Sequence, residues 1–529
     1  MKKMMKKACG KYLALILVLL LVSAVCLLFS SRKSGMFIDE IYTYALSNSD
    51  HAPFLIDLKN GEMVGTVFTR EELLDYVTVT DGEGFDFGSV YYNQVNDVHP
   101  PLYYWLFNIV STFNRNTFSM TAPLLMDGII YLAAIIMLYK LSMLLFSRRQ
   151  IACAVAVLYG LSLMGLSTML MIRMYVLLML ETVTLAYFVT LQMRSPSLKN
   201  SIAVGVCIFL GLMTQYYFVF YAFFLCVSYI IYAFVKKDFK SILRFALCAF
   251  AGVGLLLVVF PASLSHLFAD KLVSGANALE NLGKLSQYAF RFGRFFGEAR
   301  HGLKAAIYTA IVSVVILIVL FRKLKLRYKM HELSFDSLYI IVPAFVTLVV
   351  VAIVSPVDEA RYIYNIAPIF VLAVGFLLYL IDSAVWVYGT DKLRYIALAV
   401  IALFALWQAR CAPPEYLYPE YRYYDALVSQ HSDSPCVYYN DNRFEAMTQD
   451  LLQLLIFDDV YVTDKEHAAD IMDYVGDSRE FVAYFDISEF WGSGYKPDEI
   501  IDIVLSDTDY NNAELLYQNG LSATYLISK

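Results

Sequence analysis

The sequence predicts a polytopic α-helical membrane protein with about eleven transmembrane helices, a large first outer loop and a small C-terminal extracytoplasmic α/β domain. Hydrophobic residues make up 59% of the chain and charged residues 17%, whereas soluble domains are about 45–50% apolar and about 25% charged. Apolar runs near the ~20 residues that a bilayer requires recur through the first 410 residues. From Cys411 onward the chain holds 23 acidic and 6 basic residues, which separates an acidic tail from a basic membrane body.

The chain opens with a basic segment and an apolar run. Five lysines lie within the first eleven residues, and an apolar stretch follows at residues 12–29. This stretch is longer than the core of a signal peptide, and no small-residue cleavage site follows it. We therefore expect an uncleaved signal anchor with a cytoplasmic N-terminus.

Ten further apolar runs predict transmembrane helices at residues 118–146, 151–170, 174–193, 200–214, 216–235, 241–260, 304–321, 337–355, 363–387 and 392–409. Alternate connecting loops carry the basic residues: Arg148-Arg149, Arg194 and Lys199, Lys236 to Lys240, Arg322 to Lys329, and Lys392 and Arg394. The positive-inside rule puts these loops on the side of the N-terminal lysines. With an odd number of spans, the expected location is the cell membrane, with a cytoplasmic N-terminus and an extracytoplasmic tail.

The predicted domain boundary lies at residue 410. Residues 1–410 form the membrane domain, in which 31–117 is the first outer loop, and residues 411–529 form the acidic extracytoplasmic domain. Within the tail, strands are expected at 437–440, 460–463, 481–485 and 523–527, and helices at 443–454, 465–474 and 497–505. The tail contains no glycine-rich phosphate loop and no nucleophile elbow. An acidic exterior domain would also repel nucleic acid.

Polar residues recur at the outer face, in five separate loops. They are Asp39-Glu40 after the first helix, Asp97 and His99 before the second, Arg173-Met174-Tyr175, Gln215-Tyr216-Tyr217, and Asp358 to Tyr362. Polar groups at this depth are costly unless they are paired or functional. Asp127 and Glu181, inside predicted spans, are costly for the same reason.

The order of these motifs resembles the C-type glycosyltransferases, which include the protein O-mannosyltransferases and the bacterial lipid A aminoarabinose transferases. The matching residues are Phe-x-Asp-Glu from Phe37, His-Pro-Pro-Leu-Tyr-Tyr from His99, Arg-Met-Tyr from Arg173, Thr-x-Tyr-Tyr from Thr214, and Ala-Arg-Tyr from Ala360. The resemblance covers residues 12 to about 390 and leaves the tail unmatched. Where relatives carry an acid and a His, this chain has Met171 and Gln215, so neither turn is assigned a proton transfer.

The resemblance implies an enzyme that transfers a hexose or pentose from a polyprenyl-phosphate donor to an acceptor at the outer face. The acceptor would be an envelope glycan, lipid or protein, and membrane lipid surrounds the site. No cofactor is evident. A divalent cation stays open for this superfamily, but the sequence offers no metal site, because the eight cysteines include no CxxC. Cys411 and Cys436 either pair outside the cell or remain free thiols.

The acceptor hydroxyl needs a base, and Asp39 is the best candidate because partial desolvation at the membrane surface favours proton uptake. The alternative is that Asp39 caps the short helix expected at residues 39–46. Glu40 is its catalytic neighbour, chiefly as a hydrogen-bond acceptor. Asp97 and His99 are predicted substrate contacts, with a structural histidine as the alternative for His99.

The departing phosphate needs cations, and guanidinium groups suit its oxygens. Arg361 and Arg173 are the predicted phosphate ligands. The alternatives are an ion pair of Arg361 with Asp358 or Glu359, and an Arg173 side chain that extends to the membrane interface. Tyr175, Tyr216 and Tyr362 are predicted to contact sugar or prenyl chain, with an interfacial aromatic belt as the alternative.

Two other classes of function compete with a glycosyltransferase. A transporter or flippase of a lipid-linked substrate would also use many spans, but transporters place ionisable groups near the midplane and in repeated halves. A non-catalytic scaffold that displays the acidic domain would need no Asp39, His99 or Arg361. The outer segment 261–303, with Arg291, binds an acceptor or a lipid headgroup, or is a solvated amphipathic surface.

Overall fold

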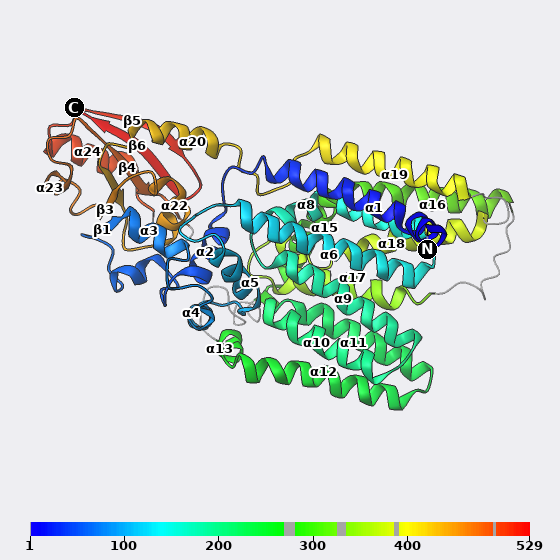
Figure 1. Ribbon diagram of the computed structural model, residues 1–529. Helices are drawn as coiled ribbons and strands as arrows, with labels where there is room; N and C mark the ends of the chain where they lie inside the picture. The colour runs from blue at the N-terminus through cyan, green and yellow to red at the C-terminus, as the bar shows by residue number, and fades with distance from the viewer. Residues whose placement is uncertain (1, 269–280, 325–334, 386–390, 490–493) are drawn as a thin grey trace. The chain divides into compact units, whose positions relative to one another are not determined.

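A computed structural model describes residues 2–268, 281–324, 335–385, 391–489 and 494–529 (Figure 1). The chain divides into two compact units, and each is described here by itself. Unit 1 comprises Met1–Ser31, Val98–Tyr103 and Leu124–Glu415, and unit 2 comprises Arg32–Asp97, Tyr104–Pro123 and Tyr416–Lys529.

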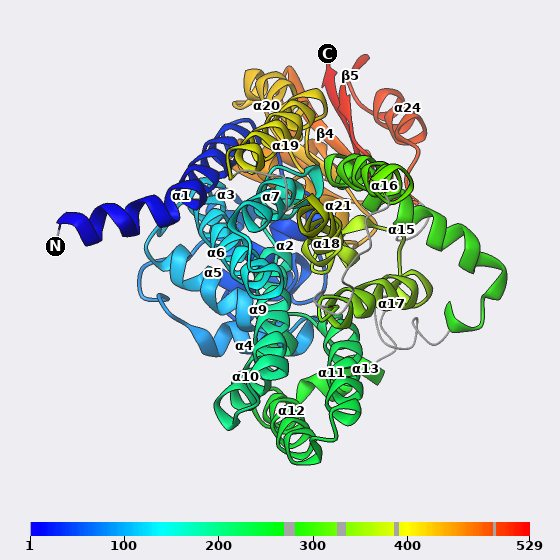
Figure 2. The same ribbon diagram turned by 90° about the vertical axis from the view of Figure 1, so that its right-hand side faces the viewer.

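Unit 1 is a bundle of long apolar helices (Figure 2). Among the described residues, eight helices are long and apolar enough to cross a membrane: α1 (Lys2–Ser30), α6 (Thr121–Phe146), α9 (Tyr175–Arg194), α11 (Phe218–Val235), α12 (Phe239–Val259), α16 (Lys304–Leu324), α18 (Ala367–Val385) and α19 (Asp391–Cys411). A ninth span results if α7 (Arg149–Gly160) and α8 (Leu163–Leu170), which are bent by 59°, count as one. Two more apolar helices, α10 (Leu198–Thr214) and α17 (Leu338–Val354), have 17 residues each.

Every predicted span therefore corresponds to an apolar helix, but length and composition support eight or nine crossings rather than eleven. The difference has two physical causes. The span predicted at 151–170 breaks at Ser162, whose hydroxyl accepts a hydrogen bond from the Gly165 amide at 3.0 Å and so starts a new helix. The helices α10 and α17 lie at the lower end of the lengths that cross a bilayer, roughly 17 residues.

Close packing of α10 and α12 depends on two glycines. A Cβ at Gly205 would collide with the Cys248 carbonyl, and a Cβ at Gly252 would collide with the Gly205 carbonyl. Small residues of this kind let two membrane helices approach through their backbones. Four shorter elements complete the described part of unit 1: α13 (Ala262–Phe268), η2 (Leu285–Gln287), α15 (Tyr288–Gly302) and η4 (Ala360–Ile363).

Unit 2 is built on a six-stranded sheet with the order β1-β3-β2-β4-β6-β5. The strands are β1 (Val67–Thr69), β2 (Cys436–Tyr439), β3 (Asp459–Thr463), β4 (Glu480–Asp486), β5 (Asn512–Gln518) and β6 (Ser522–Ser528). Strand β2 is parallel to β3 and β4, and the other pairs are antiparallel. The four strands predicted for the tail are present. The prediction missed β5.

The helices of unit 2 come from both the first outer loop and the tail. The loop forms α2 (Ile38–Asn48), η1 (Leu55–Lys59), α3 (Arg70–Val77), α4 (Phe87–Asn96) and α5 (Leu102–Thr112). The tail forms α20 (Tyr421–Val428), η5 (Ser429–His431), α21 (Glu445–Gln449), α22 (Leu451–Leu454), α23 (Met472–Val475) and α24 (Pro497–Asp507). Helix α24 packs on the sheet through Ile500 and Val504, which join a buried cluster with Phe481 and Phe485.

The first outer loop contributes a strand to the sheet of the tail. Phe68 pairs with Val460 in antiparallel register, and the Gly65 amide donates to the Val462 carbonyl at 2.8 Å. The Asn442 side chain accepts a further bond from the Met63 amide at 2.6 Å. The loop and the tail therefore form one unit, which differs from the predicted division at residue 410. A three-residue strand has too few alternating positions to be read from sequence.

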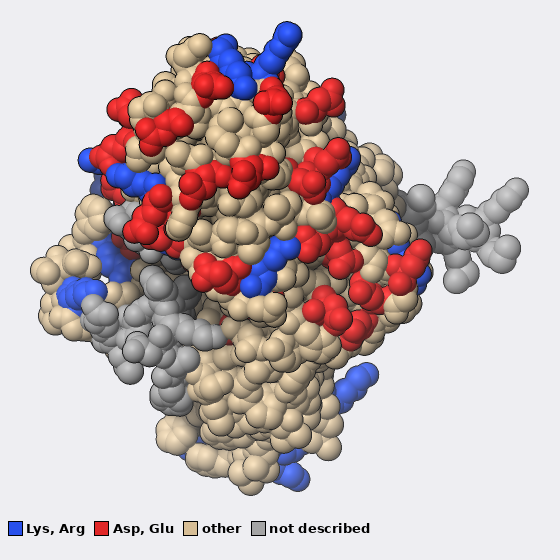
Figure 3. Space-filling view, turned by 90° about the vertical axis from the view of Figure 1, so that its left-hand side faces the viewer, with Lys and Arg blue, Asp and Glu red and all other residues tan. Residues whose placement is uncertain are grey.

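Asp and Glu side chains are scattered over the upper part of the face in Figure 3, among fewer Lys and Arg side chains. One acid lies inside: Asp450 is fully buried and accepts hydrogen bonds from Tyr438 and Asn519, each at 2.9 Å. Burial raises the pKa of Asp450 to about 6. Cys411 and Cys436 are both free thiols, and Cys436 is buried in β2.

Candidate functional site

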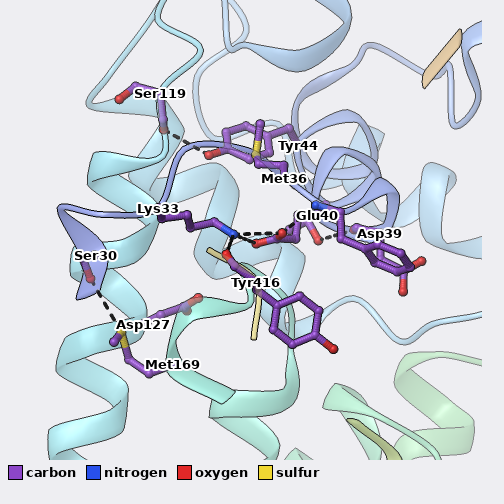
Figure 4. Close-up of polar contacts among 12 residues, drawn as sticks. Ser30, Lys33, Met36, Asp39, Glu40, Tyr44, Ser119, Asp127, Met169 and Tyr416 are labelled. Carbon is purple, nitrogen blue, oxygen red and sulfur yellow. Dashed lines mark hydrogen bonds and ion pairs between the residues drawn. The ribbon is translucent and has the colours of Figure 1, made fainter. Parts of the chain in front are cut away.

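Glu40 lies at the third position of α2 and is fully buried. Its carboxylate accepts a hydrogen bond from the Phe37 amide at 2.8 Å, which closes the first turn of the helix. The Lys33 ammonium lies 3.0 Å from Glu40 Oε1 and donates to the Tyr416 carbonyl at 2.6 Å (Figure 4). Because both side chains of the ion pair are fully buried, these contacts give Glu40 a structural role in unit 2.

Asp39 is the second residue of α2, whereas the N-cap position is taken by Phe37. The alternative role as helix cap therefore does not apply. Its side chain is half-buried and lies away from the Lys33–Glu40 pair (Figure 4). The first turn of a helix favours a negative charge, so α2 can carry an ionised carboxylate at this position. Asp39 remains the predicted base.

Three carboxylates of unit 2 act electrostatically on Tyr42. Burial raises the pKa of Tyr42 well above its ordinary range, and the charges of Glu445, Asp39 and Asp97 raise it further. Asp97 ends α4, where its amide donates to the Asn93 carbonyl at 2.9 Å. Asp39 and Asp97 thus both raise the pKa of Tyr42, although 58 positions of sequence separate them.

His99 belongs to unit 1 and is partly buried just before Pro100 and Pro101. The helix that follows this proline pair begins at Leu102. Within unit 1, the Tyr103 hydroxyl donates to both oxygens of Asp127, at 2.9 and 3.1 Å. This bond explains how a buried acid is tolerated in α6.

Arg361 lies in η4 and forms an ion pair with Glu359, with 2.9 Å between Nε and Oε2. Its guanidinium also lies over the Tyr362 ring, 5.7 Å from the centroid. The ion pair that was the alternative role for Arg361 is therefore present, and its partner is Glu359. Glu359 is 42% exposed, so the pair is open to solvent and contributes little to stability.

The other acid of this loop, Asp358, is held by Arg291 of α15 at 2.7 Å. Arg291 is 5% exposed and also donates to the Ile353 carbonyl at 3.1 Å and to the Ser355 hydroxyl at 2.9 Å. Arg291 therefore anchors the loop instead of serving as the solvated surface residue or headgroup ligand that the sequence suggested.

Arg173 lies between α8 and α9 and is 4% exposed. This burial argues against the alternative that the Arg173 side chain extends to the membrane interface. Tyr175, at the start of α9, contacts the ring of Tyr364 edge to face at 6.2 Å. Glu181, a costly acid inside a predicted span, accepts a hydrogen bond from Thr214 at 2.9 Å.

Tyr216 has a partner that sequence reasoning missed. Its hydroxyl lies 3.0 Å from Nδ1 of His266, which is buried in α13. The neighbouring Tyr217 ring packs on Tyr362 with 4.9 Å between centroids. No pattern near His266 marks it out. Sequence reasoning also missed Lys33. Its position offered a signal, because a basic residue on the predicted outer side of the first span departs from the positive-inside rule.

Contacts within unit 1 join three of the five loops that carry the sequence motifs. Tyr217 packs on Tyr362, and Tyr175 packs on Tyr364, so the turn before α11 and the turn before α9 both contact the segment around Arg361. The described residues contain no group of three or more His, Cys, Asp or Glu side chains that could hold a metal ion. The arrangement presents a guanidinium beside aromatic rings, which suits a phosphorylated and apolar ligand.

No family model and no curated protein matches this sequence. Two solved structures of ArnT from Cupriavidus metallidurans are similar in fold over 98% of both chains: the apo state, at 12% identity and a TM-score of 0.48, and a complex with undecaprenyl phosphate, at 11% and 0.44. The oligosaccharyltransferase of Archaeoglobus fulgidus, tethered to an acceptor peptide, is 12% identical over 90% of this chain and 70% of its own, with a TM-score of 0.49.

Proposed function

We propose that the protein transfers a sugar from a polyprenyl-phosphate donor to an acceptor at the outer face of the membrane, with inversion at the anomeric carbon. The observation that carries the proposal is the cluster in unit 1 of Arg361, Tyr362 and Tyr217, joined to the turn of Tyr175. A cation beside aromatic rings matches a ligand with a phosphate and an apolar chain. The donor belongs to the same chemical class as the undecaprenyl phosphate of the ArnT complex.

In this reaction Asp39 takes the proton of the acceptor hydroxyl as its oxygen attacks the anomeric carbon. The bond between that carbon and the phosphate oxygen breaks, and the prenyl phosphate leaves with the electron pair. Arg361 and Arg173 stabilise the charge of the departing phosphate. Asp97 and His99 contact the substrates, and Tyr175, Tyr216 and Tyr362 contact the sugar or the prenyl chain.

The experiment uses full-length protein in nanodiscs with a panel of polyprenyl-phosphate sugars and envelope acceptors. Formation of a glycosylated acceptor supports the proposal. Movement of the donor across a vesicle membrane without transfer would identify a flippase, and neither result would identify a scaffold. A parallel assay after dialysis against EDTA, with and without added Mg²⁺, tests whether a divalent cation takes part.

Arg361→Ala is expected to lower turnover by about 10²-fold, because one charged donor to the departing phosphate is lost. Arg361→Lys keeps the charge but loses the two-pronged geometry, so it should retain part of the activity. Steady-state transfer rates check both variants. Arg294→Ala, at an exposed position of α15, is the matched control. Full activity in both Arg361 variants would show that Arg361 does not bind the phosphate and that its ion pair with Glu359 is structural.

We propose a cytoplasmic N-terminus and an extracytoplasmic tail, on the basis of the basic loops. A reporter fused after Lys529 is expected to read as extracytoplasmic. A reporter in the loop from Lys323 to Lys329, which lies largely outside the described residues, is expected to read as cytoplasmic. Two reporters on the same side would contradict the eleven-span arrangement, in which three crossings lie between the two positions.

A further inference from the structure

A groove lies among four helices of unit 1, and none of its lining residues belongs to the proposed site. It has a volume of ≈ 340 Å³ and is lined by α7, α16, α18 and α19. Nine of its thirteen lining residues are apolar. Along α19 the lining runs from Leu393 to Ile401, which is about 12 Å at 1.5 Å per residue. Most of the groove lining is therefore apolar.

The charged side chains of the groove gather at one end. Arg148 and Arg394 both bind Asp382: Arg148 Nε lies 3.0 Å from Oδ2, and Arg394 Nε lies 2.6 Å from Oδ1. Two guanidinium groups share one carboxylate, so these three side chains carry a net positive charge. The first turns of α7 and α19 lie at the same end, and the N-terminus of a helix adds partial positive charge.

The apolar part of the groove is open to the surroundings of the helices. Leu393 is 59% exposed and Ile316 is 40% exposed, and both belong to the lining. In a membrane-spanning unit, exposed aliphatic side chains face lipid. An amphiphile from the bilayer can therefore enter sideways, with its chain along α19 and its headgroup at the two arginines.

We propose that this groove is a binding site for an anionic phospholipid. The phosphate lies at Arg148 and Arg394, and one acyl chain lies between α16 and α19. The charge of the site selects an anionic headgroup, since basic pockets between membrane helices attract such lipids. Under the topology proposed above, the site faces the cytoplasmic leaflet. The site is separate from the donor site, and its occupancy does not depend on sugar transfer.

The test titrates the delipidated full-length protein in a non-ionic detergent and counts bound lipid by native mass spectrometry. The probes are dioleoyl phosphatidylglycerol, dioleoyl phosphatidylcholine as its neutral match, and undecaprenyl phosphate. Phosphatidylglycerol is expected to bind more tightly than phosphatidylcholine. Equal binding of these two lipids would overturn the proposal, and saturable binding of undecaprenyl phosphate alone would overturn the phospholipid as occupant.

Two substitutions in the ion-paired group predict opposite results. Arg148→Gln leaves the Arg394–Asp382 pair intact and should weaken phosphatidylglycerol binding about fivefold, since each basic residue near a lipid surface contributes about that factor. Asp382→Asn removes the negative charge and should strengthen binding by a similar factor. A purely structural ion-paired group predicts loss of binding in both variants, and that result would overturn the proposal.

Two further variants separate charge from shape. Arg149→Gln removes the same charge at an exposed neighbour that does not line the groove, and it should change binding less than twofold. Ala397→Phe fills the groove and leaves every charge in place, so it should weaken both phospholipids. If Ala397→Phe has no effect, the lipid does not lie in the groove.

Discussion

Asp39→Asn is expected to lower turnover by about 10²–10⁴-fold, the usual contribution of a general base. Asparagine keeps the size of the side chain and one acceptor oxygen, but it cannot take a proton at neutral pH. Asp39 is not the N-cap of α2, and it stands apart from the buried ion pair of Glu40. The fold should therefore survive the change, and donor binding should persist while the chemical step slows.

Turnover and donor binding can be measured on the same preparation. Asp81→Asn is the matched control, because Asp81 lies in the same outer loop with a side chain 85% exposed. Its activity should stay near that of the unmodified protein. If Asp39→Asn retains turnover within a few-fold, the base is to be sought at Asp97, which also raises the pKa of Tyr42.

The membrane helices could be predicted from sequence because the signal is local. An apolar run near the thickness of a bilayer satisfies its own backbone hydrogen bonds as a helix, whatever surrounds it. The bend at Ser162 depends on one side-chain hydrogen bond inside an apolar run. Hydropathy alone does not report such a bond. It therefore predicts the apolar helices but not how many of them cross the membrane separately.

The composition of unit 2 could not be predicted, because it depends on pairing between distant segments. Strand β1 has three residues, and its partner β3 lies almost 400 positions later. The four predicted tail strands are rich in β-branched and aromatic residues, which is a local signal. The short β1 and the six-stranded order come only from tertiary contacts.

In the candidate site, too, the residue types could be predicted from sequence, but their contacts could not. The residue types and their order indicated Asp39, Arg361 and the tyrosines, since chemistry restricts which side chains can serve. The partners could not be predicted. The sequence suggested that Arg291 binds an acceptor or a headgroup or is solvated, but Arg291 holds Asp358. Arg361 pairs with Glu359. Such choices depend on how helices pack, and sequence spacing does not specify them.

Lys33→Met is expected to destabilise the protein by about 3–5 kcal/mol, because it leaves the Glu40 carboxylate buried without its cation. Both side chains are fully buried, and the ammonium also serves the Tyr416 carbonyl. The contact from Lys33 to Tyr416 joins the start of the outer loop to the start of the tail, so its loss should loosen unit 2. Arg32→Met, at an exposed neighbouring position, should have little effect.

The double variant Lys33→Met/Glu40→Gln identifies the cause. Glutamine can still accept the hydrogen bond from the Phe37 amide, and the uncompensated charge is gone, so most of the lost stability should return. Thermal unfolding of the full chain in detergent measures all variants. A double variant no more stable than Lys33→Met would show that packing of the lysine stem, and not the buried charge, is what matters. The double variant also tests the role of Glu40 in catalysis. Because the Glu40 carboxylate is structural, the folded double variant should keep turnover within a few-fold. A loss of turnover as large as that of Asp39→Asn would show that Glu40 is catalytic.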